Sequence, residues 1–309
     1  IGFIILNAAH KAGWNLNVVE VADQVLPRML DSQAAPLVKN WLTRRGVGIH
    51  TGAKVESISE DGGKKQVKLD NGSELSADVV IMATGIKTNT DLAAGTGIDT
   101  NEGILVNDRM QTSIPNIYAA GDVAEGPDLL TGNKAVHAIQ PTAVEHGKVA
   151  GANMAGKDVK YWGSLLINIL DVCELQCASF GNWGQKDSTI TVKNESRPIY
   201  RKLAWNGDVI TGATFVGPAE DVTLLNDMGM VKGLIQTQTA LGQWKDYLEA
   251  HPLDIRRPYI GTKAAAKLLK MTITGQASSD RGYRHNSLQP TAKANPHHAA
   301  YMVIPTDSS

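Results

Sequence analysis

The first part of the chain alternates helical and strand patterns of apolar residues. Apolar side chains at helical spacing indicate helices, and continuous apolar runs indicate strands of a parallel sheet that is covered on both faces. The expected elements are a helix over residues 3–13, a strand over 16–20, a helix from Asp31 or Ser32 to Arg45 and a strand over 47–50. Glycine stands at the end of each helix, at Gly13 and Gly46, and suits a C-terminal stop. This order predicts an α/β fold.

Residues 55–75 instead alternate apolar and polar positions. Strands over 66–69 and 73–75 flank Asn71-Gly72, a dipeptide that favours a tight hairpin turn. The segment 78–83 is almost entirely apolar after its first residue, and it predicts a buried strand that leads into Thr84-Gly85.

The rest of the chain divides into two parts and a tail. Strands are expected over 104–106 and 116–120, then a loop rich in Gly, Pro and Asp, then a helix over 142–154. Beyond Gly156 the expected elements are strands over 189–192, 199–205 and 209–216 and helices over 220–232 and 241–250, which form a small α+β domain. Residues 275–309 are polar with little periodicity and predict a disordered tail.

Composition narrows the range of partners. The 309 residues are 42% hydrophobic and carry 30 Lys and Arg against 31 Asp and Glu, so no broad electrostatic footprint for nucleic acid or an anionic membrane exists. The longest apolar runs fall far short of the ~20 residues that cross a bilayer. We therefore expect a soluble protein, cytoplasmic by default, with neither nucleic acid nor membrane as partner.

The cysteines and histidines suggest neither a disulfide framework nor a metal site. Cys173 and Cys177 lie in one apolar segment and are expected to fill a core, the alternative being a redox pair. The adjacent His297 and His298 lie in the polar tail, where a metal site would need further ligands.

The opening residues carry a candidate dinucleotide site. Gly2, Phe3 and Ile4 begin the first helix, where a glycine lets the backbone approach a pyrophosphate and the helix N-terminus attracts its charge. Glu20 follows the next strand at roughly the spacing of the acid that binds ribose hydroxyls. Its charge would repel the 2′-phosphate of NADP, which favours NAD. An ordinary strand, turn and helix is the alternative, because the motif's first glycine would precede the chain's first residue and Ile5 takes the place of its third.

Two strand ends are candidate ligand contacts. A buried strand ending in Thr84-Gly85 would emerge at the carboxyl edge of a sheet, where ligands of open α/β folds bind. The string from Thr112 to Asp122 is more specific, because its strand delivers Asp122 behind Gly121, which has no side chain to block approach. Such an aspartate can accept a hydrogen bond from a ribityl hydroxyl.

Gln140, Pro141 and Thr142 open the helix that runs to Met154. Proline near a helix start is already set for the first turn. A helix N-terminus aimed at a flavin would stabilise negative charge on the reduced ring without a titratable side chain.

Taken in order, these segments resemble the pyridine nucleotide-disulfide oxidoreductase superfamily, in the branch of rubredoxin and ferredoxin reductases, NADH oxidases and the flavin domain of assimilatory nitrite reductases. The resemblance covers about residues 1–260. It implies a Rossmann-like two-domain FAD/NAD(P)-binding fold, incomplete at the N-terminus, followed by a small α+β interface domain. The implied domains are an NAD(P)-binding domain without its first strand over 1–85, the C-terminal half of the FAD-binding domain over 86–158, an interface or dimerisation domain over 159–260 and a C-terminal extension over 261–309.

The resemblance also assigns the candidate site residues. NAD is contacted by Gly2, Phe3, Ile4 and Glu20 with Thr84 and Gly85 at its site, the flavin ribityl chain is held by Gly121 and Asp122, and the flavin ring is faced by Gln140, Pro141 and Thr142. No catalytic side chain is assigned. The family's first Gly-rich turn, which binds the adenosine diphosphate half of FAD, would precede Ile1, as would any redox cysteine. We therefore expect an N-terminally truncated fragment that binds FAD poorly by itself.

The resemblance implies an FAD-dependent NAD(P)H oxidoreductase. Hydride would pass from NADH, preferred over NADPH, to FAD, and electrons would then pass to an acceptor. The acceptor is expected to be an iron-sulfur protein, a dehydrogenase partner in a larger complex or a small molecule, and a homodimer and a subunit of a complex are both open. The alternatives are a redox-sensing flavoprotein interaction module with slow turnover and an inactive fragment.

Overall fold

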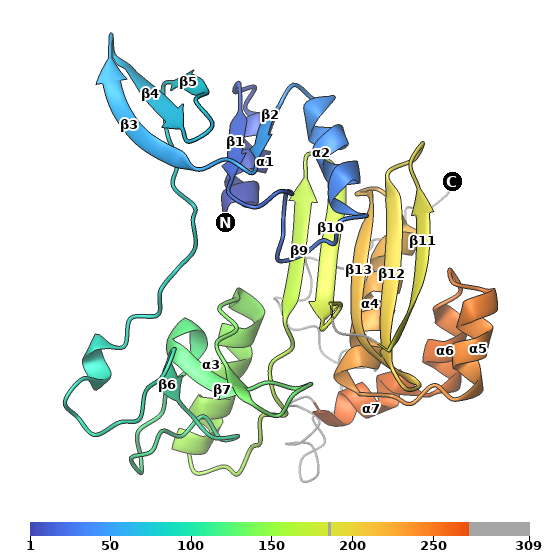
Figure 1. Cartoon of the computed structure of the whole chain (residues 1–309). Helices are drawn as coiled ribbons and strands as arrows, with labels where there is room; N and C mark the ends of the chain where they lie inside the picture. Colours follow the sequence, from blue (N-terminus) through green and yellow to red (C-terminus); the bar gives the residue numbers. More distant parts are fainter. Residues whose placement is uncertain (185–186, 272–309) are drawn as a thin grey trace, which may run out of the picture.

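The computed structural model describes residues 1–184 and 187–271. An N-terminal lobe packs against a five-stranded sheet, and a middle lobe, which lies between them in the sequence, sits at one end of that sheet (Figure 1). Within these described residues, no helix is both long enough and apolar enough to span a membrane.

The N-terminal lobe follows the predicted order of elements. It contains α1 (Gly2–Lys11), β1 (Asn17–Glu20), α2 (Ala35–Thr43) and β2 (Gly48–Thr51). β1 and β2 pair in parallel, as the continuous apolar runs predicted. α2 begins later than predicted, because the Asp31 carboxylate accepts hydrogen bonds from the backbone N–H of Gln33 and Ala34 and so closes a separate turn before the helix.

The predicted hairpin is confirmed within a small antiparallel sheet. Its strands are β3 (Val55–Asp61), β4 (Lys64–Leu69) and β5 (Glu74–Ala77). Gly72 lies in the β4–β5 turn with a φ of 84°, a conformation that L side chains rarely adopt. β3 was not predicted, because its side chains are mostly exposed and polar.

The predicted buried strand at residues 78–83 is wrong. The chain between β5 and the short turn η1 (Asp91–Ala93) is extended and crosses from the N-terminal lobe to the middle lobe (Figure 1). Val79 and Met82 in this segment are 59% and 63% exposed. An apolar run becomes a strand only where a neighbouring strand takes its backbone hydrogen bonds, and no strand of the described chain pairs with this segment.

The middle lobe surrounds its own hydrophobic core. It contains β6 (Ile104–Leu105), η2 (Gly121–Val123), β7 (Ala124–Pro127), β8 (Lys134–Ala135) and α3 (Gln140–Met154). The predicted helix over 142–154 is confirmed, whereas the predicted loop before it holds β7 and β8. The predicted strand over 116–120 is wrong: it is reduced to an isolated bridge between Gln111 and Tyr118, because Asn116 takes a φ of 66° and breaks the extended backbone.

The C-terminal part is an antiparallel sheet with helices. Its strands are β9 (Ile167–Val172), β10 (Leu175–Gly181), β11 (Ser188–Asn194), β12 (Ile199–Asn206) and β13 (Val209–Pro218), in the order β11-β12-β13-β10-β9, and its helices are α4 (Val222–Gln236), α5 (Gln243–Ala250), α6 (Arg256–Gly261) and α7 (Ala264–Met271). The predicted strands correspond to β11, β12 and β13, and the predicted helices to α4 and α5. β9, β10, α6 and α7 were missed. The predicted tail over 275–309, with His297 and His298, lies outside the described residues.

Side chains along each strand point alternately to the two faces of this sheet, and each face packs against a different part of the chain. Tyr200, Val216 and Cys177 point into a core shared with the N-terminal lobe. Leu203 and Phe215, from the same strands, point into a core shared with α4. The N-terminal lobe is therefore fixed to the sheet by a common core. The domain boundaries expected from the sequence stay a prediction.

The two cysteines fill a core, as predicted. Cys173 and Cys177 are both buried and unpaired in the core between the N-terminal lobe and the sheet. Burial raises the pKa of each thiol, most strongly that of Cys177. Since the thiolate is the reactive form, the environment disfavours the alternative of a redox pair.

Asp31 joins the N-terminal lobe to the sheet by polar contacts. Its Oδ2 accepts hydrogen bonds from the Tyr200 hydroxyl and the Lys202 ammonium, both at 2.8 Å, and the Lys202 side chain is only 7% exposed. Burial opposes ionisation of Asp31, but the hydrogen bonds from Lys202, Tyr200 and Ala34 outweigh it and lower the pKa of Asp31. The charged carboxylate is therefore the stabilising form.

Asp31→Asn is expected to lower the free energy of unfolding by roughly 1–3 kcal/mol near neutral pH, because a buried ammonium loses its charged acceptor. An acid whose pKa is depressed in the folded state stabilises the fold at pH values above its unfolded-state pKa. This stabilisation is lost as the pH falls through the folded-state pKa. The difference from wild type should therefore shrink in urea unfolding at about pH 3. A pH-independent difference, or an equal loss in the control Asp246→Asn on exposed α5, would contradict this account.

Candidate functional site

Gly121 and Asp122 lie against the N-terminus of α3. Gly121 has a φ of 80°, and a Cβ added to it would lie 3.5 Å from the Cβ of Ala143 in the first turn of α3. No side chain of the described chain caps this helix, whose N-cap residue is Ile139. An uncapped N-terminus offers free N–H groups and a partial positive charge to an electron-rich ligand. The fold therefore brings Gly121 next to the first turn of α3, where Gln140, Pro141 and Thr142 lie.

Asp122 faces a cavity of about 320 Å³. The cavity is lined by Ile86, Lys87, Thr88, Asn89, Asp122 and Val123. The segment that begins at Thr84-Gly85 thus ends beside Asp122. Within the residues described, no hydrogen bond or ion pair engages the Asp122 carboxylate, which is free to accept hydrogen bonds from ligand hydroxyls. The bare Gly121 backbone, the free carboxylate and the uncapped helix fit the ribityl chain and ring of a flavin.

Gly2 opens α1 next to the other end of the same segment. A Cβ added to Gly2 would lie 3.2 Å from the Cβ of Ala83, which directly precedes Thr84. No described side chain caps α1 either. Phe3 packs into the core shared with the sheet, whereas Ile4 is 60% exposed. Only the backbone of Phe3 is thus placed to meet a ligand, and the close approach of Gly2 to Ala83 leaves little room for a side chain at Gly2.

Glu20 ends β1, and its carboxylate is held in place. Its Oε1 accepts a hydrogen bond from the backbone N–H of Ala22 at 3.0 Å, which fixes it at the carboxyl end of the strand. The second carboxylate oxygen can accept a ribose hydroxyl. Among the described contacts none joins Glu20 to Gly2 or Gly85, so the structure brings Gly2 to Thr84-Gly85 and Asp122 to α3 but leaves Glu20 apart.

Sequence reasoning missed the buried polar residues of the middle lobe. Glu125 on β7 is 4% exposed and accepts hydrogen bonds from Asn101 Nδ2 and Gly103 N, both at 3.0 Å. In the same lobe His146 is buried, and the side chain of His137 is 10% exposed. A single acid or histidine in a loop or on a helix face carries no spacing signal, so only the fold shows that these side chains are buried.

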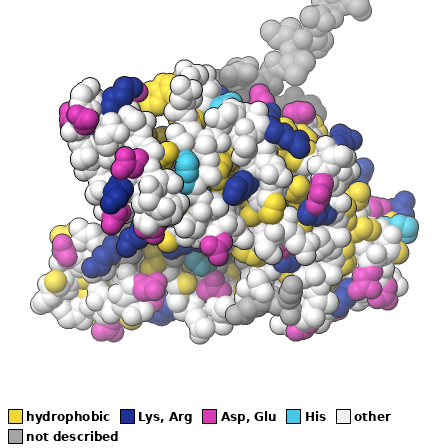
Figure 2. Space-filling view, turned by 45° about the horizontal axis from the view of Figure 1, so that its top comes forward, with side chains coloured by type: hydrophobic (Ala, Val, Ile, Leu, Met, Phe, Trp, Pro, Cys, Tyr) yellow, Lys and Arg dark blue, Asp and Glu magenta, His cyan; other side chains and the backbone are white. Residues whose placement is uncertain are grey.

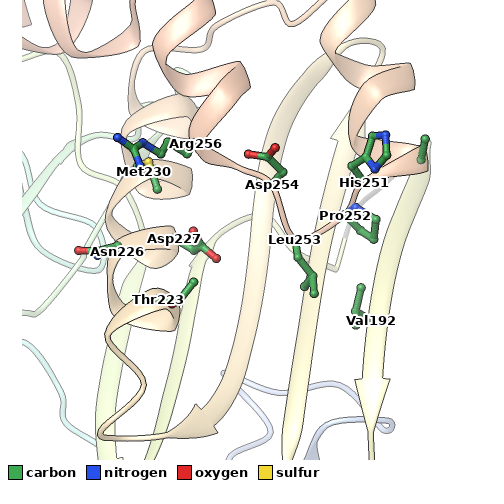
Figure 3. A pocket seen from close by; sticks show the side chains of 11 residues that line it. Val192, Thr223, Asn226, Asp227, Met230, His251, Pro252, Leu253, Asp254 and Arg256 are labelled. Carbon is green, nitrogen blue, oxygen red and sulfur yellow. The ribbon is translucent and has the colours of Figure 1, made fainter.

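A larger cavity lies elsewhere, on the helix-covered face of the sheet, between α4 and residues 250–256 (Figure 3). It measures about 690 Å³. Both acids on its walls form ion pairs within the protein: Asp227 with Arg201, and Asp254 with Arg257 at 3.2 Å. It shares no residue with the predicted site.

The surface shows no patch of one charge sign over the face in Figure 2, where acidic and basic side chains are interspersed. This agrees with the formal net charge of −1.

Residues 1–146 match the family described as pyridine nucleotide-disulphide oxidoreductase. The chain is 39% identical over 184 residues to the NADH oxidase of Methanocaldococcus jannaschii, covering 59% of this chain and 40% of that protein. It is 31% identical over 268 residues to the NADH-dependent phenylglyoxylate dehydrogenase subunit epsilon of Aromatoleum evansii, covering 83% of this chain and 61% of that protein.

Solved structures agree with these matches. The NAD-dependent persulfide reductase from A. fulgidus superimposes with a TM-score of 0.70 at 31% identity, covering 79% of this chain and 48% of that one. The predicted fold class is confirmed by this likeness. The chain spans 40% and 61% of the length of the two curated relatives.

Proposed function

Because residues 1–146 belong to the pyridine nucleotide-disulphide oxidoreductase family, we propose that the protein is an FAD-dependent oxidoreductase that uses NADH. The observation that carries the proposal is the contact of Gly121-Asp122 with the uncapped N-terminus of α3. When bound, FAD supplies the redox chemistry by accepting hydride from the nicotinamide and passing electrons on to an acceptor.

The residues of this chain bind the two cofactors and orient them. Asp122 accepts hydrogen bonds from the ribityl chain, and Gly121 leaves room for it beside Ala143. The N–H groups at the start of α3, around Thr142, stabilise negative charge on the ring. Gly2 admits the dinucleotide phosphates at α1, and Glu20 receives the ribose. Holding the nicotinamide and the flavin in the correct relative position accelerates hydride transfer between them.

The acceptor is proposed to be a protein. Support comes from the resemblance to the epsilon subunit of NADH-dependent phenylglyoxylate dehydrogenase in Aromatoleum evansii, which covers 83% of this chain. We propose an electron-transfer role of that kind, in the cytoplasm, where the two unpaired cysteines suit a reducing compartment. The gene product at its natural length should release FAD on heat denaturation, in an amount close to one per chain. Absence of flavin after reconstitution with FAD would contradict the proposal.

Glu20→Ala is expected to raise the KM for NADH by at least about tenfold, or 1.4 kcal/mol, because the ribose loses its charged acceptor. FAD content should not change. Steady-state kinetics with NADH and an artificial acceptor measure the effect, and Glu249→Ala on the exposed face of α5 is the control. An unchanged KM in Glu20→Ala would remove this residue from the nicotinamide site.

A further inference from the structure

A lysine of α2 reaches the carboxyl edge of the parallel strands in the N-terminal lobe. Lys39 Nζ donates a hydrogen bond to the hydroxyl oxygen of Thr51, the last residue of β2, at 3.1 Å. Lys39 and Thr51 are both half-buried. An ammonium on a flexible four-carbon stem has no fixed position in solvent, so this contact gives it one.

Thr51 is the direct neighbour of Glu20. β1 and β2 are parallel, and Glu20 pairs with Thr51 at the carboxyl end of both strands. Neighbouring strands lie about 4.8 Å apart, and the side chains of paired residues point to the same face of a sheet. The backbone joins the two strand ends, because the N–H of Ala53 donates to the carbonyl oxygen of Glu20 at 3.2 Å. The Lys39 ammonium is therefore held beside the acid that is proposed to receive the ribose.

The helix that carries Lys39 is fixed to the five-stranded sheet. Val38 and Leu42 of α2 are buried in the core that the N-terminal lobe shares with the sheet. Trp41 Nε1 also donates a hydrogen bond to the carbonyl oxygen of Cys173 at 2.8 Å. The position of Lys39 is thus set by the fold itself.

Neither of the two opposite charges is neutralised by the protein. Among the described residues no ion pair engages the Lys39 ammonium or the Glu20 carboxylate, whose Oε1 accepts a hydrogen bond from the backbone N–H of Ala22. An acid that binds the ribose hydroxyls repels a 2′-phosphate, and a nearby cation offsets that repulsion. A lysine serves this purpose as a point charge for phosphate.

We propose that Lys39, positioned by Thr51, forms a subsite for the 2′-phosphate of NADPH beside Glu20. The inference rests on the proposed function and adds a second nucleotide to the one that Glu20 favours. With NADH, Glu20 accepts hydrogen bonds from both ribose hydroxyls. NADPH has no free 2′-hydroxyl to donate, but its 2′-phosphate gains the charge of Lys39. The site therefore prefers NADH without excluding NADPH.

The test compares two nucleotides that differ only in the 2′-phosphate. Adenosine 2′,5′-bisphosphate and adenosine 5′-monophosphate are titrated into the gene product at its natural length, and calorimetry gives both dissociation constants independently of flavin chemistry. In Lys39→Gln the affinity for the bisphosphate should fall at least about tenfold, whereas the affinity for the monophosphate should change less than about twofold. Lys39→Arg keeps the charge and should retain most of the bisphosphate affinity.

Arg44→Gln is the matched control, because it removes one positive charge from the exposed C-terminal end of the same helix. Its affinities for both nucleotides should stay close to those of wild type. Thr51→Val keeps the Lys39 charge but removes the hydroxyl that positions it, and it should weaken binding of the bisphosphate alone. This variant tests the subsite even if Lys39→Gln fails to fold.

Two kinds of result separate the subsite from the proposed function. The subsite would be overturned, with the NADH site intact, if wild type bound the monophosphate but not the bisphosphate. Equal losses for both nucleotides in Lys39→Gln, or an equal loss of bisphosphate affinity in Arg44→Gln, would also overturn it. A wild type that binds neither nucleotide would instead contradict the proposed function, and the subsite with it.

Discussion

Gly121→Val is expected to weaken FAD binding by at least about tenfold, or 1.4 kcal/mol. Gly121 has a φ of 80°, which a β-branched residue adopts only with strain of roughly 1–3 kcal/mol. The new side chain would also press on Ala143 at the start of α3, because a Cβ alone already comes within 3.5 Å. Fluorescence titration of the apoprotein with FAD measures the dissociation constant.

Gly132→Val is the matched control for backbone strain. Gly132 lies in the same lobe with a φ of 71°, and nothing lies within 4 Å of an added Cβ. It should lose similar stability but keep its FAD affinity. Equal affinity losses in both variants would mean that strain alone, and not contact with the ligand, explains the effect at Gly121.

Asp227→Ala is expected to lower the free energy of unfolding by about 3–5 kcal/mol, because it leaves a buried guanidinium without its counter-charge. Arg201 on β12 is 8% exposed and donates from Nη1 to Asp227 on α4, and its Nε has no partner within the described part of the chain. The pair links the sheet to the helix that covers it. Urea or thermal unfolding gives the loss, with the flavin content recorded alongside.

Two comparisons separate the buried charge from the loss of packing. Arg201→Met combined with Asp227→Leu should recover most of the stability, because no charge stays buried. Glu56→Ala breaks the exposed pair between Glu56 and Lys68 and should cost less than about 1 kcal/mol. If Glu56→Ala costs as much as Asp227→Ala, or if the double variant is no better than the single one, burial is not the cause.

The sequence predicted elements well where local signals and tertiary packing agree. α1 has an apolar face, α3 begins at Gln140-Pro141, and β12 and β13 flank the turn at Asn206-Gly207-Asp208. It failed where the deciding factor is a partner elsewhere in the chain. Residues 78–83 have the composition of a buried strand but no neighbour in the described structure to pair with. β9 and β10 were missed because Cys173 and Glu174, both at positive φ, form their turn without a typical turn sequence.

Only those parts of the candidate site that carry a local sequence signal could be predicted. Gly121-Asp122 and the helix start at Gln140 carry local signals, since a glycine at positive φ and a proline in the first turn each have a backbone requirement. His137 and His146 carry none. The burial of their side chains depends on how β7 and α3 pack, and no spacing along the chain reports that.

Anaerobic mixing of the FAD-loaded protein with NADH tests the central claim most directly. The gene product is purified at its natural length, reconstituted with FAD and mixed with NADH in a stopped-flow instrument, and the flavin absorbance is followed. The account predicts rapid bleaching, faster with NADH than with NADPH. Bound flavin that stays oxidised with both nucleotides would contradict it.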